Sequence, residues 1–214
     1  MSIDNVWTAV GLDRAPAAVL WDMDGTIIDS ESEWARFTRQ MVLEAGGVWT
    51  DDDEAYILGA NSADHGARMA QAIERGGGDH RDAQAMFDEL GALMTAEVYA
   101  KAVLLPGARE LLVAFRDAGI PQAMVTATPK DVVDVALEAL GEAYFNAVVT
   151  GSEDIPGKPD PAPYLLGAQR LAADPGECLA FEDSVAGLAA ARASGAHVVD
   201  VNEGKVAELA TLLK

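Results

Sequence analysis

Five short runs of apolar residues recur along the chain, and they alternate with longer stretches in which apolar residues return every three or four positions. Continuous apolar runs are typical of strands buried on both faces of a parallel sheet, and the periodic stretches are typical of amphipathic helices. The runs lie at residues 17–21, 122–125, 147–150, 178–181 and 196–201, and the helical stretches at residues 107–118, 130–140, 161–172, 185–194 and 205–213. Strands that alternate with helices predict right-handed crossovers and an α/β core with a doubly wound parallel sheet.

The alternation is interrupted between the first predicted strand and Pro106. This part of the chain has helical periodicity and no clear strand, with predicted helices at residues 32–45, 51–58, 63–75 and 81–100. A structureless loop of this length is uncommon inside a compact domain. We therefore expect two domains, an α/β core domain made of residues 1–28 and 103–214 and an inserted α-helical domain made of residues 29–102.

The charge balance disfavours two classes of partner. The chain has 214 residues with 35 acidic and 15 basic side chains, and its formal net charge of −20 opposes binding to nucleic acid and to anionic membranes. The single cysteine, Cys178, cannot form an internal disulfide, which fits a reducing cytoplasm. No apolar stretch approaches the roughly 20 residues of a membrane span, and residues 1–16 do not resemble a signal peptide. We expect a cytoplasmic protein without a nucleic-acid or membrane partner, as a monomer or a weak homodimer.

Two carboxylates follow the first predicted strand, in the sequence Asp22-Met23-Asp24-Gly25-Thr26. In an open α/β sheet, ligands bind at the carboxyl ends of the strands. At such a place an aspartate can attack phosphorus, a neighbouring carboxyl can transfer a proton, and clustered oxygens suit Mg²⁺. A helix cap or an Asx turn would also explain an Asp-Gly pair, so this motif alone leaves the structural alternative open.

The next three strands are followed by further polar groups. Thr126 opens the sequence Thr126-Ala127-Thr128, where a hydroxyl can bond a phosphoryl oxygen together with the amides of the next helix. Lys158 lies between Gly157 and Pro159 and can neutralise a phosphate, and the acid pair Glu182-Asp183 can complete a magnesium site. Helix caps or a solvated loop lysine would explain each group separately. Capping does not explain a nucleophile, a hydroxyl, a lysine and an acid pair in this order at one edge of the sheet.

The order and spacing of these four motifs resemble those of the haloacid dehalogenase-like hydrolase superfamily, over a span from about Ala17 to Val201. The segments 157–161 and 181–187 resemble its β-phosphoglucomutase-like phosphatase branch, which has a helical cap inserted after the first strand of a Rossmann-like core. The resemblance implies a magnesium-dependent phosphatase that hydrolyses a small phosphorylated metabolite, such as a sugar phosphate, through an aspartyl-phosphate intermediate.

The resemblance also implies a role for each motif residue. Asp22 would be the nucleophile and a magnesium ligand, and Asp24 the general acid/base, which would bind the metal through its main-chain carbonyl. Thr126 and Lys158 would hold the phosphoryl group, with Ala127 as a neighbouring contact to the substrate. The remaining metal ligands would be Glu182 and Asp183. The helical cap would close over the substrate and exclude water.

Departures from the family pattern narrow the expected activity. The presence of Asp24 argues against carbon–halogen chemistry, and the absence of lysine between Asp24 and Lys101 argues against the phosphonate-cleaving route. Trp34, Leu58 and Ser62 stand where β-phosphoglucomutases have a histidine, a lysine and an arginine, so the cationic grip on a second phosphate is missing. We expect a phosphomonoester hydrolase. The alternatives are a β-phosphoglucomutase-type phosphosugar isomerase and a non-catalytic phosphometabolite-binding protein.

Specificity is expected to come from the helical domain. The candidate contacts to the substrate are Glu31, Trp34, Asn61 and Ser62. Packing in a helical core would equally explain Trp34, and a helix cap would explain Asn61 and Ser62. Arg68 could reach an anionic group, although a solvated helix face explains it more simply. The acidic run at residues 51–54 is expected to begin a helix, where anions favour the helix dipole.

Overall fold

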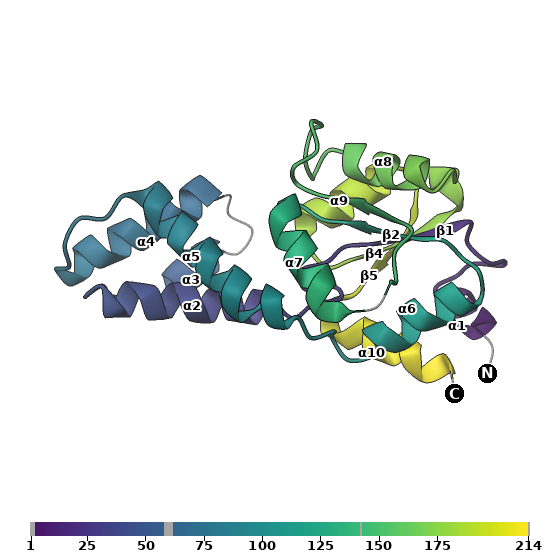
Figure 1. The fold of residues 1–214 in the computed structure, drawn as a ribbon, viewed down its shortest axis with the longest axis horizontal. Coiled ribbons are helices and arrows are strands. Elements are labelled where there is room, and N and C mark those ends of the chain that lie inside the picture. The colour runs from purple at the N-terminus through teal and green to yellow at the C-terminus, as the bar shows by residue number, and fades with distance from the viewer. Residues whose placement is uncertain (1–2, 58–61, 142, 214) are drawn as a thin grey trace. The chain divides into compact units, whose positions relative to one another are not determined.

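The structure is a computed structural model that describes residues 3–57, 62–141 and 143–213, without the side chains of Glu31 and Glu203. It divides into two compact units (Figure 1). The sheet unit comprises Met1–Asp29 and Ala102–Lys214, and the helical unit comprises Ser30–Lys101. No helix among the described residues is long and apolar enough to cross a membrane.

The sheet unit is built on five parallel strands in the order β3-β2-β1-β4-β5. Their bounds are β1 Ala18–Trp21, β2 Gln122–Val125, β3 Ala147–Val149, β4 Cys178–Glu182 and β5 His197–Asp200. The predicted doubly wound parallel sheet is therefore confirmed. Trp21 at the end of β1 pairs with Met124 of β2 and Phe181 of β4. This register places the residues that follow the three central strands at one edge of the sheet.

Helices cover both faces of the sheet, α8 and α9 on one and α6 and α10 on the other (Figure 1). The helices of this unit after β1 are α6 Ala108–Asp117, α7 Lys130–Leu140, α8 Ala162–Arg170, α9 Val185–Ala193 and α10 Lys205–Ala210. Short 3₁₀ segments lie at η2 Pro175–Glu177, η3 Asn202–Gly204 and η4 Thr211–Leu213. All five predicted helices form, with the last one ending as η4.

The two faces of the sheet are packed differently. The face under α8 and α9 is filled mostly by small and aliphatic side chains such as Leu20, Val125 and Ala180. The opposite face is aromatic, because Trp21 stacks on Phe181 with ring centroids 4.1 Å apart and meets the edge of Phe115 of α6. These rings are fully buried, and full burial of one such side chain contributes about 1.5–3 kcal/mol. The strands that carry the residues at this edge of the sheet are therefore packed against helices on both faces.

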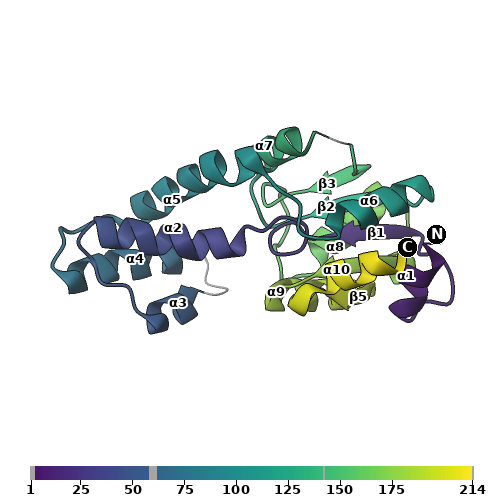
Figure 2. The same ribbon diagram turned by 90° about the horizontal axis from the view of Figure 1, so that it is seen from below.

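A short helix that the sequence did not predict, α1 Asp4–Ala9, begins the described chain. It packs on α10 and η4 through the buried side chains of Val6 and Trp7. The ring of His197 in β5 forms a hydrogen bond with the carbonyl of Val10, which fixes the segment that follows the helix. The first described helix thus packs against the last described helical segments of the sheet unit (Figure 2).

The helical unit consists of α2 Glu31–Glu44, α3 Asp51–Ile57, α4 Ser62–Gly76, α5 Ala83–Glu97 and the 3₁₀ segment η1 Tyr99–Lys101. All four predicted helices form. The core of the unit includes fully buried methionines and branched side chains, among them Met69, Ile73 and Leu90. His65 is also buried, and its Nε2 lies 2.9 Å from the hydroxyl of Thr38. Burial lowers the pKa of His65 to about 4.

A buried ionic cluster connects α3 with α4, and it corrects one expectation. Asp53 is fully buried, and its Oδ1 lies 2.6 Å from Nε of Arg68 while its Oδ2 pairs with Arg75. The backbone amide and the hydroxyl of Thr50 also donate to this carboxylate. Arg68 therefore does not lie on a solvated helix face, because it neutralises Asp53. From the sequence, Asp53 was expected only to begin a helix. We call Asp53, Arg68 and Arg75 the α3–α4 clasp.

Candidate active site

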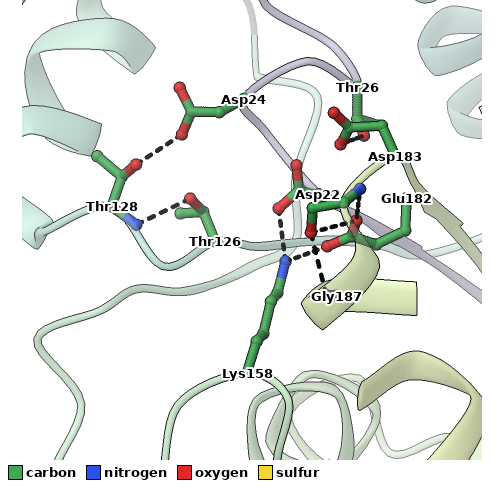
Figure 3. A network of polar contacts seen from close by, with 10 residues as sticks. Asp22, Asp24, Thr26, Thr126, Thr128, Lys158, Glu182, Asp183 and Gly187 are labelled. Atoms are coloured by element: carbon green, nitrogen blue, oxygen red, sulfur yellow. Dashed lines mark hydrogen bonds and ion pairs between the residues drawn. The ribbon is translucent and has the colours of Figure 1, made fainter. Parts of the chain in front are cut away.

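The carboxyl ends of the strands form a polar edge of the sheet (Figure 3). Side chains from the ends of β1, β2 and β4 meet there with Lys158 from a loop. Lys158, from the loop between β3 and α8, donates from Nζ to Asp22 Oδ1 at 2.5 Å and to Glu182 Oε1 at 2.6 Å. The three side chains are at most 9% exposed. The ammonium group is therefore held between the ends of β1 and β4, where it can attract an anion.

Three carboxylates converge beside this lysine. Oxygen atoms of Asp22, Glu182 and Asp183 all lie within 4.8 Å of one another. One ammonium group balances only part of this negative charge, and hard carboxylate oxygens in such a cluster are the ligands that Mg²⁺ and similar divalent cations prefer. The donor set therefore fits a hard divalent cation.

Burial and neighbouring charges strongly perturb the groups of this cluster. Burial is the main cause that raises the pKa of Asp22 well above its usual value, and the negative charges of Glu182 and Asp24 raise it further, against the lowering effect of Lys158. Burial by itself lowers the pKa of Lys158, but Asp22 and Glu182 outweigh that effect and raise it. Lys158 thus stays charged, and a cation close to Asp22 would favour the charged carboxylate that a nucleophile requires.

Two glycines allow the carboxylates to approach the backbone. A Cβ atom on Gly187 would lie 1.5 Å from Glu182 Oε1, and a Cβ atom on Gly25 would lie 2.1 Å from Asp183 Oδ2. Gly25 also has φ of +77°, which other residues rarely adopt. Ser184 caps α9 through the amide of Gly187 and also donates to Glu182 Oε2 from its own amide at 2.8 Å. The segment after β4 therefore both caps α9, as the structural alternative assumed, and brings Glu182 and Asp183 to the carboxylate cluster.

Asp24 does not join the carboxylate cluster. Its side chain turns toward the segment after β2, and its Oδ2 accepts a hydrogen bond from Thr128 Oγ1 at 2.6 Å (Figure 3). Thr126 is 3% exposed and lies beside this pair, and its Oγ1 accepts from the amide of Thr128 at 3.0 Å. The edge thus carries one carboxylate cluster next to Lys158 and one separate carboxyl next to two threonine hydroxyls.

Sequence reasoning missed Tyr164 of α8, which lies under the lysine. Nζ of Lys158 is 5.1 Å from the centre of the Tyr164 ring, and the ring is fully buried. Burial, followed by the charges of Asp22 and Glu182, raises the pKa of its hydroxyl well above the usual value. The only signal in the sequence was an aromatic residue at a core position of an amphipathic helix, which does not reveal that its face meets an ammonium group.

The candidates from the helical domain lie in the helical unit. Trp34 is half-buried, stacks on Phe87 with ring centroids 5.7 Å apart and donates from Nε1 to the Tyr99 hydroxyl at 3.4 Å. Ser62 is the exposed first residue of α4, whereas Asn61 and Leu58 lie outside the described residues. Glu31 begins α2. In the sheet unit, Ala127 is exposed between the two threonines.

A family of known hydrolases matches most of the chain. A model of haloacid dehalogenase-like hydrolases matches residues 16–195. Hexitol phosphatase A of Escherichia coli K12 is 33% identical over 189 residues, which make up 86% of this chain and 82% of that protein. The phosphorylated carbohydrates phosphatase of Thermotoga maritima is 30% identical over 195 residues, 88% of each chain.

The fold also matches solved structures. A Thermotoga maritima protein provisionally designated a β-phosphoglucomutase superposes with a TM-score of 0.73 and 27% sequence identity. The superposition covers 92% of this chain and 97% of that one. The similarity therefore includes both the sheet unit and the inserted helices.

Proposed function

This chain belongs to the haloacid dehalogenase-like hydrolase family, in which it is a phosphatase for phosphorylated metabolites, and we propose that it works through an aspartyl phosphate on Asp22. The proposal rests on one observation above all. The buried carboxylate of Asp22 lies 2.5 Å from the Lys158 ammonium, at the edge of the sheet where ligands of such folds bind.

In the first step, Asp22 acts as the nucleophile. One of its carboxylate oxygens attacks phosphorus, and the bond from phosphorus to the ester oxygen breaks with its electron pair on the leaving oxygen. Asp24, in its protonated form, donates its proton to that oxygen, so that the alcohol leaves and an acyl phosphate remains on Asp22. Lys158 offsets the negative charge that gathers on the phosphoryl oxygens.

In the second step, water replaces the alcohol. The ionised Asp24 removes a proton from water, whose oxygen attacks phosphorus, and the bond to Asp22 breaks with its electron pair on the carboxylate. Inorganic phosphate leaves, and both aspartates return to their first states. Thr126 contributes its hydroxyl, and the backbone next to Ala127 its amides, as donors to the phosphoryl oxygens during both steps.

Magnesium is the cation that we propose for the carboxylate cluster. Asp22, Glu182 and Asp183 would hold it, together with the main-chain carbonyl of Asp24. When bound, it would neutralise the phosphoryl group and the attacking carboxylate. Three carboxylates beside a single ammonium group support this assignment, because the excess negative charge would otherwise repel an anionic substrate.

The proposed substrate is the monophosphate of a small polar metabolite, such as a sugar or sugar alcohol. The two phosphatases described above are named for hexitol and carbohydrate phosphates. We propose that the helical unit selects the substrate, with contacts from Glu31, Trp34, Asn61 and Ser62, and that it excludes water during the reaction. We also propose that the protein is cytoplasmic and that it is a monomer or a weak homodimer.

Replacement of the nucleophile tests the mechanism directly. Asp22→Asn keeps the shape of the side chain but removes its nucleophilic charge, so turnover should fall on the order of 10⁴-fold or more. Released phosphate from a set of sugar phosphates measures the rate, and circular dichroism checks the fold. Acid-quenched wild-type enzyme should carry phosphate on Asp22. Wild-type turnover by Asp22→Asn would refute covalent catalysis at this residue.

A phosphosugar mutase is not favoured as the activity. The curated relatives described above are phosphatases, and the sequence has no cations at the helical positions that bind a second phosphate in mutases. Hydrolysis should therefore proceed without a sugar bisphosphate primer. A requirement for such a primer, with little release of phosphate, would reverse this choice.

A further inference from the structure

We propose that Thr128 is a positioning residue that holds the carboxyl of Asp24 apart from the carboxylate cluster, so that Asp24 serves proton transfer. This inference depends on the role that the proposed function gives to Asp24. Thr128 Oγ1 donates to Asp24 Oδ2 at 2.6 Å, a length typical of a strong hydrogen bond to a carboxylate. Figure 3 shows the Asp24 side chain turned toward Thr128 and away from Asp22.

The backbone of Thr128 is held on both sides, which fixes the place from which its side chain extends toward Asp24. Its amide donates to Thr126 Oγ1 at 3.0 Å, and its carbonyl accepts from the amide of Gly151 at 2.9 Å. Pro129 follows directly and restricts the backbone of the residue before it. A threonine whose backbone is held in this way can impose an orientation on the carboxyl that accepts its hydrogen bond.

Gly151 makes this arrangement possible. A Cβ atom on Gly151 would lie 2.0 Å from the carbonyl oxygen of Ala127, so any larger residue would push the segment between Thr126 and Thr128 away. The loops after β2 and β3 therefore lie in close backbone contact. This contact sets the place of Thr128 independently of Asp24.

The need for such a residue follows from the charges at the edge of the sheet. Asp24 is only two residues from Asp22, and a cation in the carboxylate cluster would attract a fourth carboxylate. A carboxylate bound to the cation would be a poor proton donor. The hydrogen bond from Thr128 opposes this attraction and keeps Asp24 available to the leaving oxygen.

A positioning role for Thr128 can be distinguished from a merely structural role by comparing substrates whose leaving groups differ in basicity. A strongly basic leaving oxygen needs the proton of Asp24, whereas a weakly basic one departs with little help. Phenyl phosphate and 4-nitrophenyl phosphate are esters of similar size that differ in this property. The ratio kcat/KM includes only steps up to the first irreversible one, which is formation of the phosphoenzyme with release of the phenol. The quotient of kcat/KM for the two esters therefore reports proton donation.

The experiment compares Thr128→Val with Thr128→Ser on the two esters. Thr128→Val should lower kcat/KM about tenfold for phenyl phosphate and about twofold for 4-nitrophenyl phosphate. The loss of about tenfold is smaller than that expected for removal of a general acid, because Asp24 itself is still present. Thr128→Ser keeps the hydroxyl and should restore the wild-type quotient. Thr211→Val makes the same substitution at an exposed threonine of η4 and should leave the quotient unchanged.

Other results would overturn the inference. Equal losses for both esters in Thr128→Val would make Thr128 a ligand of the phosphoryl group or a merely structural residue. A gain in activity would mean that Thr128 holds Asp24 in an unproductive position. Asp24→Asn serves as the benchmark and should show the same selective loss, but larger. An active Asp22→Asn variant would instead overturn the proposed function, so the two failures are distinguishable.

Discussion

The two units each bury a cluster of carboxylates and cations, but the balance of charge is opposite. At the edge of the sheet, the single ammonium group of Lys158 pairs with Asp22 and Glu182, which form a cluster of three carboxylates with Asp183. In the α3–α4 clasp, two guanidinium groups surround the single carboxylate of Asp53. The first cluster still needs positive charge, whereas the second already has its negative charge fully matched.

The difference separates a reactive cluster from a structural one. Burial raises the pKa of Asp22 well above its usual value, so its charged form is costly until positive charge arrives. Burial also tends to raise the pKa of Asp53, but hydrogen bonds from Thr50 and the contact with Arg75 lower it to about 2. Both clusters contain short contacts between carboxylates and cations. A buried ion pair therefore indicates a reactive or a structural role only when all the charges of its cluster are counted.

Removal of divalent cations should give the largest effect and should act on one cluster only. Dialysis against EDTA should lower phosphatase activity by at least about a hundredfold, because the carboxylate excess then repels the substrate. Added Mg²⁺ should restore the activity. Hydrogen exchange in peptides of the helical unit should not change, because its clasp carries its own counter-charges. Undiminished activity in excess EDTA would contradict the proposed metal site.

Asp53→Asn should give the next largest effect, on stability. It leaves two arginines without their partner and should cost about 2–3 kcal/mol, less than a fully buried pair because Arg75 is partly exposed. Urea denaturation with hydrogen exchange should place the loss in the helical unit. Asp52→Asn, at an exposed neighbour on the same helix, is the matched control and should change the free energy of unfolding little.

Acid should weaken the helical unit through its buried histidine. The folded pKa of His65 is lowered to about 4, below the usual 6.5, because burial disfavours the charged ring. The neutral ring is therefore stabilising at pH values above about 6.5, and this stability is lost as the pH falls toward 4. Between pH 7 and 5 the loss should be about 2 kcal/mol. His65→Gln should remove this slope from hydrogen exchange in the helical unit, and an unchanged slope would contradict the assignment.

Asp22→Asn should give the smallest effect on stability, with the sign opposite to that of Asp53→Asn. A raised pKa means that the charged carboxylate of Asp22 costs folding free energy at neutral pH, and Lys158 keeps Glu182 as a partner after the substitution. The metal-free variant should therefore be more stable by about 1 kcal/mol. Thermal unfolding in EDTA measures it, and a clear loss of stability would show that the cluster is balanced after all.

The sheet and the order of the site residues could be predicted because they depend on local pattern. Continuous apolar runs marked all five strands, and parallel strands bring their carboxyl ends to one edge, so Asp22 and Glu182 were expected at the same edge. Their direct contact through Lys158 also depends on β1 and β4 being neighbours, which the sequence pattern did not predict. The helix at residues 4–9 was not predicted. It buries only Val6 and Trp7, which is too short a pattern for a helical period to be recognised.

Contacts between distant side chains could not be predicted, because several partners were possible for each. From the sequence, Asp53 was expected only to begin a helix. In the structure it pairs with Arg68 and Arg75, which lie fifteen or more positions later in the chain. The face of Tyr164 under Lys158 and the hydrogen bond between Thr128 and Asp24 depend on side-chain directions that a linear pattern does not contain.

The chain leaves and re-enters the sheet unit at a single point. Ile28 and Leu104 form an isolated antiparallel bridge, and the amide of Leu105 donates to the carbonyl of Ile27 at 2.8 Å. All the residues of the helical unit are thus enclosed in a loop whose two ends are already joined by hydrogen bonds. We therefore expect that a short turn, or the corresponding segment of a relative, can replace the helical unit between residues 29 and 102 with the strands of the sheet kept in place.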